Sequence, residues 1–424
     1  MSSAKKFLLV LICLVGSVAA WGQAARTPFS SFGIGEPYGN ALIHNQGMGG
    51  VGLAHPQFWF LNNQNPALLV YNGLTVFEAG IVLERRTLRG DTTSERSDNG
   101  NMNYLATAFP IKPGKWSTSI GLMPYTTVNY KVIDTEGDVI GSDETVTEIE
   151  EGSGGLTQLY WSNGVRLNSE FSIGLKATYI FGSITKTYSN QLNIQDQSAV
   201  FLVPVEDKTF MKDFSFTAGL SYSKDSIGSN HQYRVSLGGI YGFSTKLNAE
   251  RTLKLQRTDA VGNIYESLEL DSINGHVQLP ATFGFGASFS KGSKWMLGID
   301  YYYSNWNKYS SVSQEGEGLE ASSKIAIGGE FTPDVVSVDN YLKRINYRLG
   351  LSYEKYPFLA NNKAVTDFGI NFGFSLPAGR SSLDFAFKLG KRGNKAENIL
   401  EENYFKVYFG ITFNDQWFIK RKFD

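Results

Sequence analysis

The residues that could do chemistry are few and scattered. The chain has four histidines, His44, His55, His231 and His276, and their spacing does not match that of metal ligands. The Gly-x-Ser-x-Gly pattern that marks one class of hydrolase nucleophile is absent. The single cysteine, Cys13, lies in an apolar stretch near the N-terminus. We therefore expect no enzyme activity, no cofactor and no metal site.

Two further patterns favour a structural role. Gly47-x-Gly49-x-x-Gly52 has the letters of a dinucleotide-binding loop, but no apolar strand precedes it and no helical pattern follows it. Asp300 and Asp384 lie on the polar faces of segments in which polar and apolar residues alternate. We expect these carboxylates to hold another part of the chain by hydrogen bonds rather than to act as acids or bases.

Composition excludes several classes of protein. The 424 residues include 39 Lys+Arg and 40 Asp+Glu, so the chain lacks the basic surplus of a nucleic-acid-binding protein. The counts of 45 Gly, 22 Tyr and 29 Phe favour strands over helices. A mean hydropathy of −0.20, with no long apolar run after the N-terminus, excludes a bundle of membrane-spanning helices. The strands of a membrane β-barrel alternate, so their mean hydropathy is mild and fits this composition.

The N-terminus has the pattern of a signal peptide, which we assign to residues 1–22. Lys5 and Lys6 precede the apolar residues 7–15, and small residues at 18–20 suit cleavage. Removal of this segment would leave an exported chain without cysteine, which excludes a disulfide framework.

The body of the chain consists of alternating segments. In 403–413, for example, Phe405, Val407 and Phe409 share one face, while Lys406 and Gly410 lie on the other. About fourteen such segments follow one another: 74–88, 101–112, 115–133, 155–168, 170–188, 210–224, 231–247, 277–290, 294–308, 320–332, 343–356, 364–376, 381–392 and 403–413. Short turns alternate with longer connections near 134–154, 189–209, 248–276 and 393–402.

These features predict an all-β fold, a transmembrane antiparallel β-barrel of about 14 strands in residues 73–424. A soluble β-sandwich also alternates, but its outward face is charged. Here the polar face is rich in Gly, Ser and Thr with charges of both signs, which suits a crowded, hydrated lumen.

Residues 23–72 do not alternate, and their glycines and asparagines predict tight turns. This segment lies either outside the barrel or within its lumen. The apolar run Phe58, Trp59, Phe60 and Leu61 favours the lumen, because a barrel of this width needs filling unless it is an open pore. We therefore predict an N-terminal luminal hatch.

The chain resembles the outer-membrane long-chain fatty acid transporter family (FadL/TodX-type). The residues that carry the resemblance are the glycine-rich stretch with Gly47, Gly49 and Gly52, then Asn65, Pro66 and Ala67, then the hairpin 279–306 and the strands from Arg348 to Asp384. The resemblance implies a hatch containing these residues, a location in the outer membrane of a Gram-negative bacterium and passive diffusion of hydrophobic molecules through a plugged barrel. The family also contains barrels that serve protein secretion, including the cargo shuttle of the type IX system. A barrel subunit that binds cargo or partner proteins in an envelope complex is therefore the alternative function.

Two places are candidates for contact with a ligand. Residues 199–205 form an apolar run in an expected extracellular loop, and we assign ligand contact to Phe201, Leu202, Val203 and Phe210, together with Phe58, Trp59 and Phe60 of the hatch. The run could instead pack against the long connection 248–276. The expected partners are outer-membrane lipid, a hydrophobic small molecule and, for the alternative function, other proteins of the envelope.

Pro124 interrupts the third predicted strand, where proline removes a ladder hydrogen bond and predicts a kink. In the resembled family a kink in the third strand opens a lateral window to lipid. The alternative is that Pro124 simply lies above the membrane.

Overall fold

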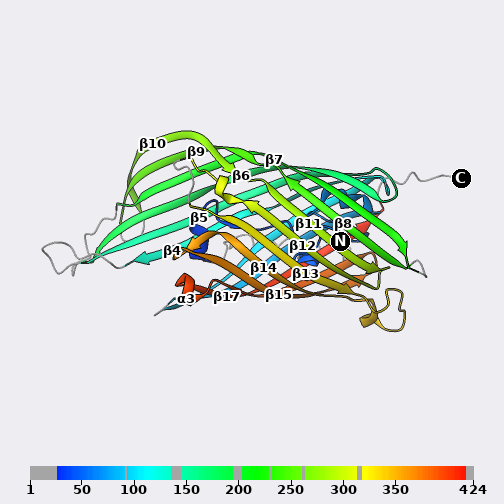
Figure 1. The fold of residues 1–424 in the computed structure, drawn as a ribbon. Coiled ribbons are helices and arrows are strands. Elements are labelled where there is room, and N and C mark those ends of the chain that lie inside the picture. The colour runs from blue at the N-terminus through cyan, green and yellow to red at the C-terminus, as the bar shows by residue number, and fades with distance from the viewer. Residues whose placement is uncertain are drawn as a thin grey trace, which may run out of the picture.

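The chain folds into a closed antiparallel β-barrel, seen from the side in Figure 1. The computed structural model describes residues 26–90, 93–134, 145–193, 203–228, 232–259, 263–312 and 318–416. The predicted signal peptide lies outside these residues. None of the helices in these ranges has the length and apolar character needed to cross a membrane.

The wall contains sixteen strand segments, β2 to β17. They are β2 (Thr75–Arg89), β3 (Ser94–Lys112), β4 (Trp116–Asp134), β5 (Thr145–Arg166), β6 (Phe171–Asn193), β7 (Val205–Ile227), β8 (Tyr233–Gly242), β9 (Thr245–Thr258), β10 (Ile264–Leu279), β11 (Thr282–Lys291), β12 (Trp295–Asn305), β13 (Ala321–Phe331), β14 (Asn346–Ala360), β15 (Lys363–Ala378), β16 (Ser381–Arg392) and β17 (Glu401–Asp415). The first and last of them, β2 and β17, pair along their whole length and close the barrel.

These segments occupy 14 positions around the barrel, as the sequence predicted. Two positions hold two segments each. The segments β8 and β9 share one position, where both pair with β7. The segments β10 and β11 share the next, where β10 pairs with β9 and β11 pairs with β8. The interruptions fall side by side, at residues 243–244 and 280–281. Pro280, which lacks an N–H group, occupies one of them.

The outer face of the wall is apolar. Large side chains that alternate along the strands remain exposed on this face, among them Phe283, Phe285, Leu297, Ile299, Ile327, Leu349, Leu351 and Leu383. The intervening residues, such as Asp300, Ser352 and Asp384, are buried inside. Such a surface is what a membrane barrel presents to lipid.

The strands on one side of the barrel are longer than predicted. The described residues of the expected loops 134–154, 189–209 and 248–276 are largely strand, since β5 begins at Thr145, β7 at Val205 and β10 at Ile264. The reason is that both faces of these extensions carry polar residues, as in Thr147, Glu148, Glu150 and Glu151, so no alternation reveals them. We call the end with these extensions the long-loop rim and the opposite end, with turns such as 113–115 and 379–380, the short-turn rim.

Residues 26–72, which we call the N-terminal segment, lie inside the barrel (Figure 1). They contain η1 (Pro28–Ser31), β1 (Glu36–Pro37), α2 (Ile43–Gln46) and η2 (Pro66–Tyr71). Leu42, Ile43, Leu61 and Leu69 pack against inward-facing side chains of the wall, and all four are fully buried. The remaining short helices connect wall strands: η3 (Trp306–Lys308), η4 (Tyr341–Arg344) and α3 (Lys395–Asn398).

Candidate functional site: the barrel interior

Buried polar side chains of the wall hold the backbone of the N-terminal segment. Oδ2 of Asp300 accepts hydrogen bonds from the amides of Gly52 and Leu53, at 2.7 and 2.8 Å. Glu78 accepts from the amide of Leu61, at 2.8 Å. Asp300 therefore has the holding role expected from the sequence, whereas Asp384 bonds instead to hydroxyls of the wall, including that of Thr412 at 2.7 Å.

The Asn65-Pro66-Ala67 stretch forms the start of η2. The side-chain oxygen of Asn65 accepts from the Ala67 amide, and its nitrogen donates to the carbonyls of Leu53 and Leu220. Pro66 takes the first helical position, where an N–H is not needed. This one side chain thus joins a turn, a second part of the segment and strand β7.

Glycines of the wall let the segment approach closely. A Cβ added at Gly238 would lie 1.8 Å from the carbonyl oxygen of Leu53, and one added at Gly350 would lie 2.2 Å from the carbonyl carbon of Met48. Within the segment, Gly49 has φ +74° and also lies against the wall, 2.7 Å from the Leu351 carbonyl oxygen for an added Cβ. Gly47 approaches Gly373 in the same way. The glycines at these positions are therefore needed for close packing of two backbones.

A cluster of buried charges fixes the first part of the segment, and we call it the arginine cluster. Arg86 of β2 and Arg392 of β16 both contact the carboxylate of Glu36, at 3.2 and 2.6 Å, and that of Glu402, at 3.1 and 3.4 Å. Glu84 also bonds to Arg86 at 2.6 Å. Burial alone would raise the pKa of Glu36, but the Arg392 and Arg86 guanidiniums hold it well below its usual range.

The barrel wall has a gap beside Pro124. Strand β4 pairs with β3 only up to Leu122, opposite Leu105. Beyond this point β4 pairs with β1 instead, Glu36 opposite Thr127 and Pro37 opposite Thr126, while a bulge at Tyr125 interrupts its pairing with β5. Strand β1 therefore lies where the next residues of β3 would otherwise pair.

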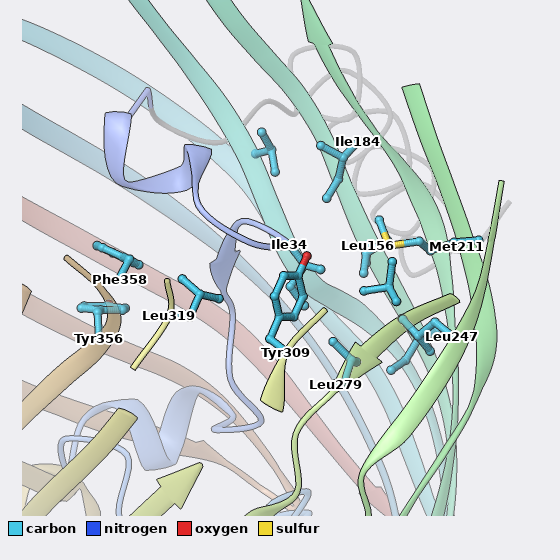
Figure 2. Close-up of a cluster of buried hydrophobic side chains, with 14 of the residues drawn as sticks. Ile34, Leu156, Ile184, Met211, Leu247, Leu279, Tyr309, Leu319, Tyr356 and Phe358 are labelled. Atoms are coloured by element: carbon cyan, nitrogen blue, oxygen red, sulfur yellow. The ribbon is translucent and has the colours of Figure 1, made fainter. Parts of the chain in front are cut away.

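A cluster of apolar side chains lies in the long-loop half of the interior, and we call it the chamber (Figure 2). Ile34 projects from the N-terminal segment toward Leu156, Met211, Leu247 and Leu279 of the wall. Phe29 and Phe358 stack at 5.7 Å between ring centroids on another side of the same cluster. These residues come from eleven regions of the sequence that the barrel brings together: the segment itself, β4 to β7, β9 and β10, the residue after η3, the connection before β13, and β14 and β15.

Cavities adjoin the chamber on two sides. The outer one, the vestibule, has a volume of about 380 Å³ and is lined by Ile184, Met211, Lys186 and Arg251 among others. The inner cavity has a volume of about 310 Å³, and its lining includes Ile180, Ile240 and Leu279. Ile34 borders both.

A third, small cavity lies at the wall gap, with a volume of about 60 Å³ and a lining of polar residues such as Glu84, Arg86 and Asn101. Pro37 and Tyr38 border both this gap cavity and the inner cavity. The three cavities therefore lie in series, and residues of the N-terminal segment stand at each boundary.

The residues assigned to ligand contact from sequence lie elsewhere. Phe58 and Trp59 are exposed and pack edge to face beside Gly73, just before β2 begins at the short-turn rim. Phe60 is buried between His44 and Arg348. Phe201 and Leu202 lie outside the described residues, and Val203 and Phe210 are partly exposed. None of the five described residues lines the three cavities.

The chamber residues of the wall escaped the sequence analysis because they are single or paired apolar positions in luminal rows that are otherwise largely polar. Ile180, for example, lies between Thr178 and Gly182 on the luminal face of β6. An apolar residue that breaks a polar luminal row is the only signal that could have identified them.

Two histidines of the segment are buried. Burial lowers the pKa of His55 to about 4, and burial with the nearby charge of Arg348 lowers the pKa of His44 well below its usual range. No cluster of three metal-ligating side chains occurs in the described ranges. The histidines are therefore packing groups that stay neutral near pH 7.

Comparison with known proteins agrees with this architecture. A family model described as BamG matches residues 3–424. Among solved structures, the toluene transporter TbuX of Ralstonia pickettii is similar with a TM-score of 0.54 and 12% identity, over 88% of this chain and 98% of that one. The toluene transporter TodX of Pseudomonas putida reaches 0.55 and 14%, over 90% and 98%. A FadL homologue of Pseudomonas aeruginosa reaches 0.55 and 13%, over 89% and 98%. No curated protein matches.

The close approach at Gly238 predicts a first test. In Gly238→Ala the added methyl group collides with the Leu53 carbonyl, and we expect overpacking of about 1–3 kcal/mol to loosen the segment. A cysteine placed at buried Ala54 should then react with a maleimide roughly five- to a hundredfold faster. Gly239→Ala is the matched control, since its nearest atom lies 3.9 Å away. Equal labelling in the two variants would contradict the packing argument.

Acid should also loosen the segment. The pKa of His55 is about 4 in the folded protein and 6.5 ordinarily. As the pH falls below about 6.5, His55 therefore takes up a proton in a detached segment but not in a docked one, which favours detachment. The His55 contribution should weaken docking by about 3 kcal/mol between pH 6.5 and 4 and should add no further loss below pH 4. We expect labelling of a cysteine at Ala54, relative to one at exposed Ser94, to rise in this window. In His55→Gln the rise should shrink; an unchanged rise would assign it to other groups.

Proposed function

Since the chain belongs to the BamG family and encloses three cavities in series, we propose that it is an outer-membrane barrel that transports small hydrophobic molecules by passive diffusion. The resemblance to the FadL-type fold and the apolar outer belt support a place in the outer membrane of a Gram-negative bacterium. The N-terminal segment acts in this proposal as the hatch.

The proposal rests on one observation: residues of the hatch lie at each boundary between neighbouring cavities. A molecule that enters the vestibule reaches the inner cavity by displacing Ile34, and the wall gap by displacing Pro37 and Tyr38. Cavities of about 310–380 Å³ fall at the lower end of the range for small-molecule sites. The gap beside Pro124 is the proposed lateral exit, closed while β1 pairs with β4.

A fatty-acid-like ligand suits the vestibule better than a neutral hydrocarbon. The Lys186 ammonium donates one hydrogen bond to the Ser31 carbonyl, at 3.1 Å, and has two further protons for a carboxylate. The apolar chain would then extend toward Ile34 and Met211.

A reversible tether tests this route. Cysteines replacing Pro37 and Thr126, which are paired, would lock β1 to β4 when oxidised. We expect the oxidised protein to bind radiolabelled oleate but to lose its transfer into liposomes, and reduction to restore transfer. The control joins β3 to β4 where they already pair, through cysteines at Ala108 and Ser119. Full transfer through the oxidised Pro37–Thr126 tether would exclude the lateral exit, and lack of oleate and toluene binding would exclude the function itself.

A second candidate is a partner-binding subunit of an envelope complex. The connection 332–345, on the short-turn rim, exposes Val336 and Val338 by 82% and 92%, and Leu342 by 62%. Exposed apolar side chains of this kind suit a protein contact. If this function holds, Val336→Asp with Val338→Asp should reduce recovery of a defined partner in a crosslinked pulldown severalfold and leave oleate binding unchanged. Leu167→Asp, an exposed leucine of another turn, is the control. Unchanged recovery would exclude this surface.

A further inference from the structure

Strand β10 ends the extended side of the wall with one backbone edge open. Its residues pair with β9 from Ile264 to Leu279. On its other side, the described residues provide one bridge, between Gln278 and Ser310, and Val312 lies 3.0 Å from where a Cβ at Gly275 would stand. Between Glu266 and Asn274 the described chain therefore leaves alternate N–H and C=O groups of this edge without a strand partner.

The side chains of this stretch are exposed on both faces. Every residue from Ile264 to Asn274 is exposed, including Leu268 at 61% and Leu270 at 49%. A strand that is open on one edge and carries apolar groups can accept another extended chain, with backbone hydrogen bonds for affinity and side-chain pairs for specificity.

Charge defines which chain would fit. The stretch carries Glu266, Glu269 and Asp271 and has no Lys or Arg. Its one existing partner, β9, is basic: Lys254 lies opposite Glu269, and Arg257 contacts Glu266 at 3.6 Å. A second copy of β10 would set carboxylates against carboxylates, which destabilises strand pairing. A strand with basic and apolar residues would repeat the chemistry of β9.

We propose that the β10 edge at the long-loop rim is a docking site for an extended polypeptide segment that alternates basic and apolar residues. The site extends the wall sheet by one strand at Glu266–Asn274. It is separate from the cavities and from the connection 332–345, so its presence does not depend on either function proposed above. The bulges at Tyr265 and Leu270 interrupt the regular hydrogen-bond ladder of β10, so the docked chain can pair only over a short stretch.

The probe is a synthetic peptide with the sequence of β9, Thr245–Thr258, labelled with a fluorophore and added to the detergent-solubilised full protein. We expect saturable binding by fluorescence anisotropy. Glu269→Lys with Asp271→Lys should weaken it by about tenfold, since two attractive cross-strand pairs become repulsive. A peptide with its Lys and Arg replaced by Glu should show the opposite preference. Glu95→Lys with Glu397→Lys, two exposed acids elsewhere, should leave binding unchanged.

Backbone pairing is tested separately from charge. Two further peptides carry N-methyl groups, one at the odd-numbered residues and the other at the even-numbered residues. Each therefore loses half of its N–H donors but keeps its charges. At least one should lose binding. Absence of binding by the unmodified peptide, undiminished binding by both methylated peptides, or undiminished binding by the charge-reversed protein would overturn the proposal. A concentration-dependent dimer abolished by the same charge reversal would overturn it in favour of a second copy.

Discussion

The shared contact of two buried arginines with Glu36 is the interaction on which the interior depends. Arg86 and Arg392 are almost fully buried, and each would be strongly unfavourable without carboxylate partners. Glu36 supplies one of those partners from outside the wall. The N-terminal segment therefore completes a charge balance that the wall strands leave incomplete, and β1 is held at the wall gap as a consequence.

From the arginine cluster toward the short-turn rim, the fit between the N-terminal segment and the wall depends on shape rather than charge. The glycines of the wall and of the segment bring backbone against backbone, and single polar side chains such as Asp300 and Asn65 satisfy the amides that this packing buries. Toward the long-loop rim the chamber lies beside the arginine cluster, where Arg392 donates to Tyr356, and cavities remain on either side of Ile34. The same segment is thus closely packed in the middle of the lumen, whereas toward the long-loop rim it is held by charge and leaves cavities beside Ile34.

Much of this fold could be predicted because a membrane barrel has a strict period. The alternation in 381–392 and 403–413 marked β16 and β17 within two residues of their ends. The alternation of polar and apolar residues disappears where both faces of a strand are polar. The parts of β5, β7, β9 and β10 near the long-loop rim were therefore assigned to loops. The alternation also gave no sign that β10 ends with an open edge. The inner site was harder: Glu36 and Arg86 are distant in sequence from Arg392 and Glu402, and only barrel closure brings them together. Asp300 was found because its acidic side chain interrupts a luminal row beside glycines.

The seam between β2 and β17 has a consequence for how the protein is assembled. Arg86 lies on β2 and Glu402 on β17, so the arginine cluster spans the last pairing that closes the barrel. Its remaining members reach it from β16 and from the N-terminal segment. The cluster is therefore incomplete until the seam has formed. Enclosure of the segment and closure of the barrel are accordingly coupled steps of folding, and a chain that closed around an empty lumen would leave the two arginines with Glu402 but without Glu36.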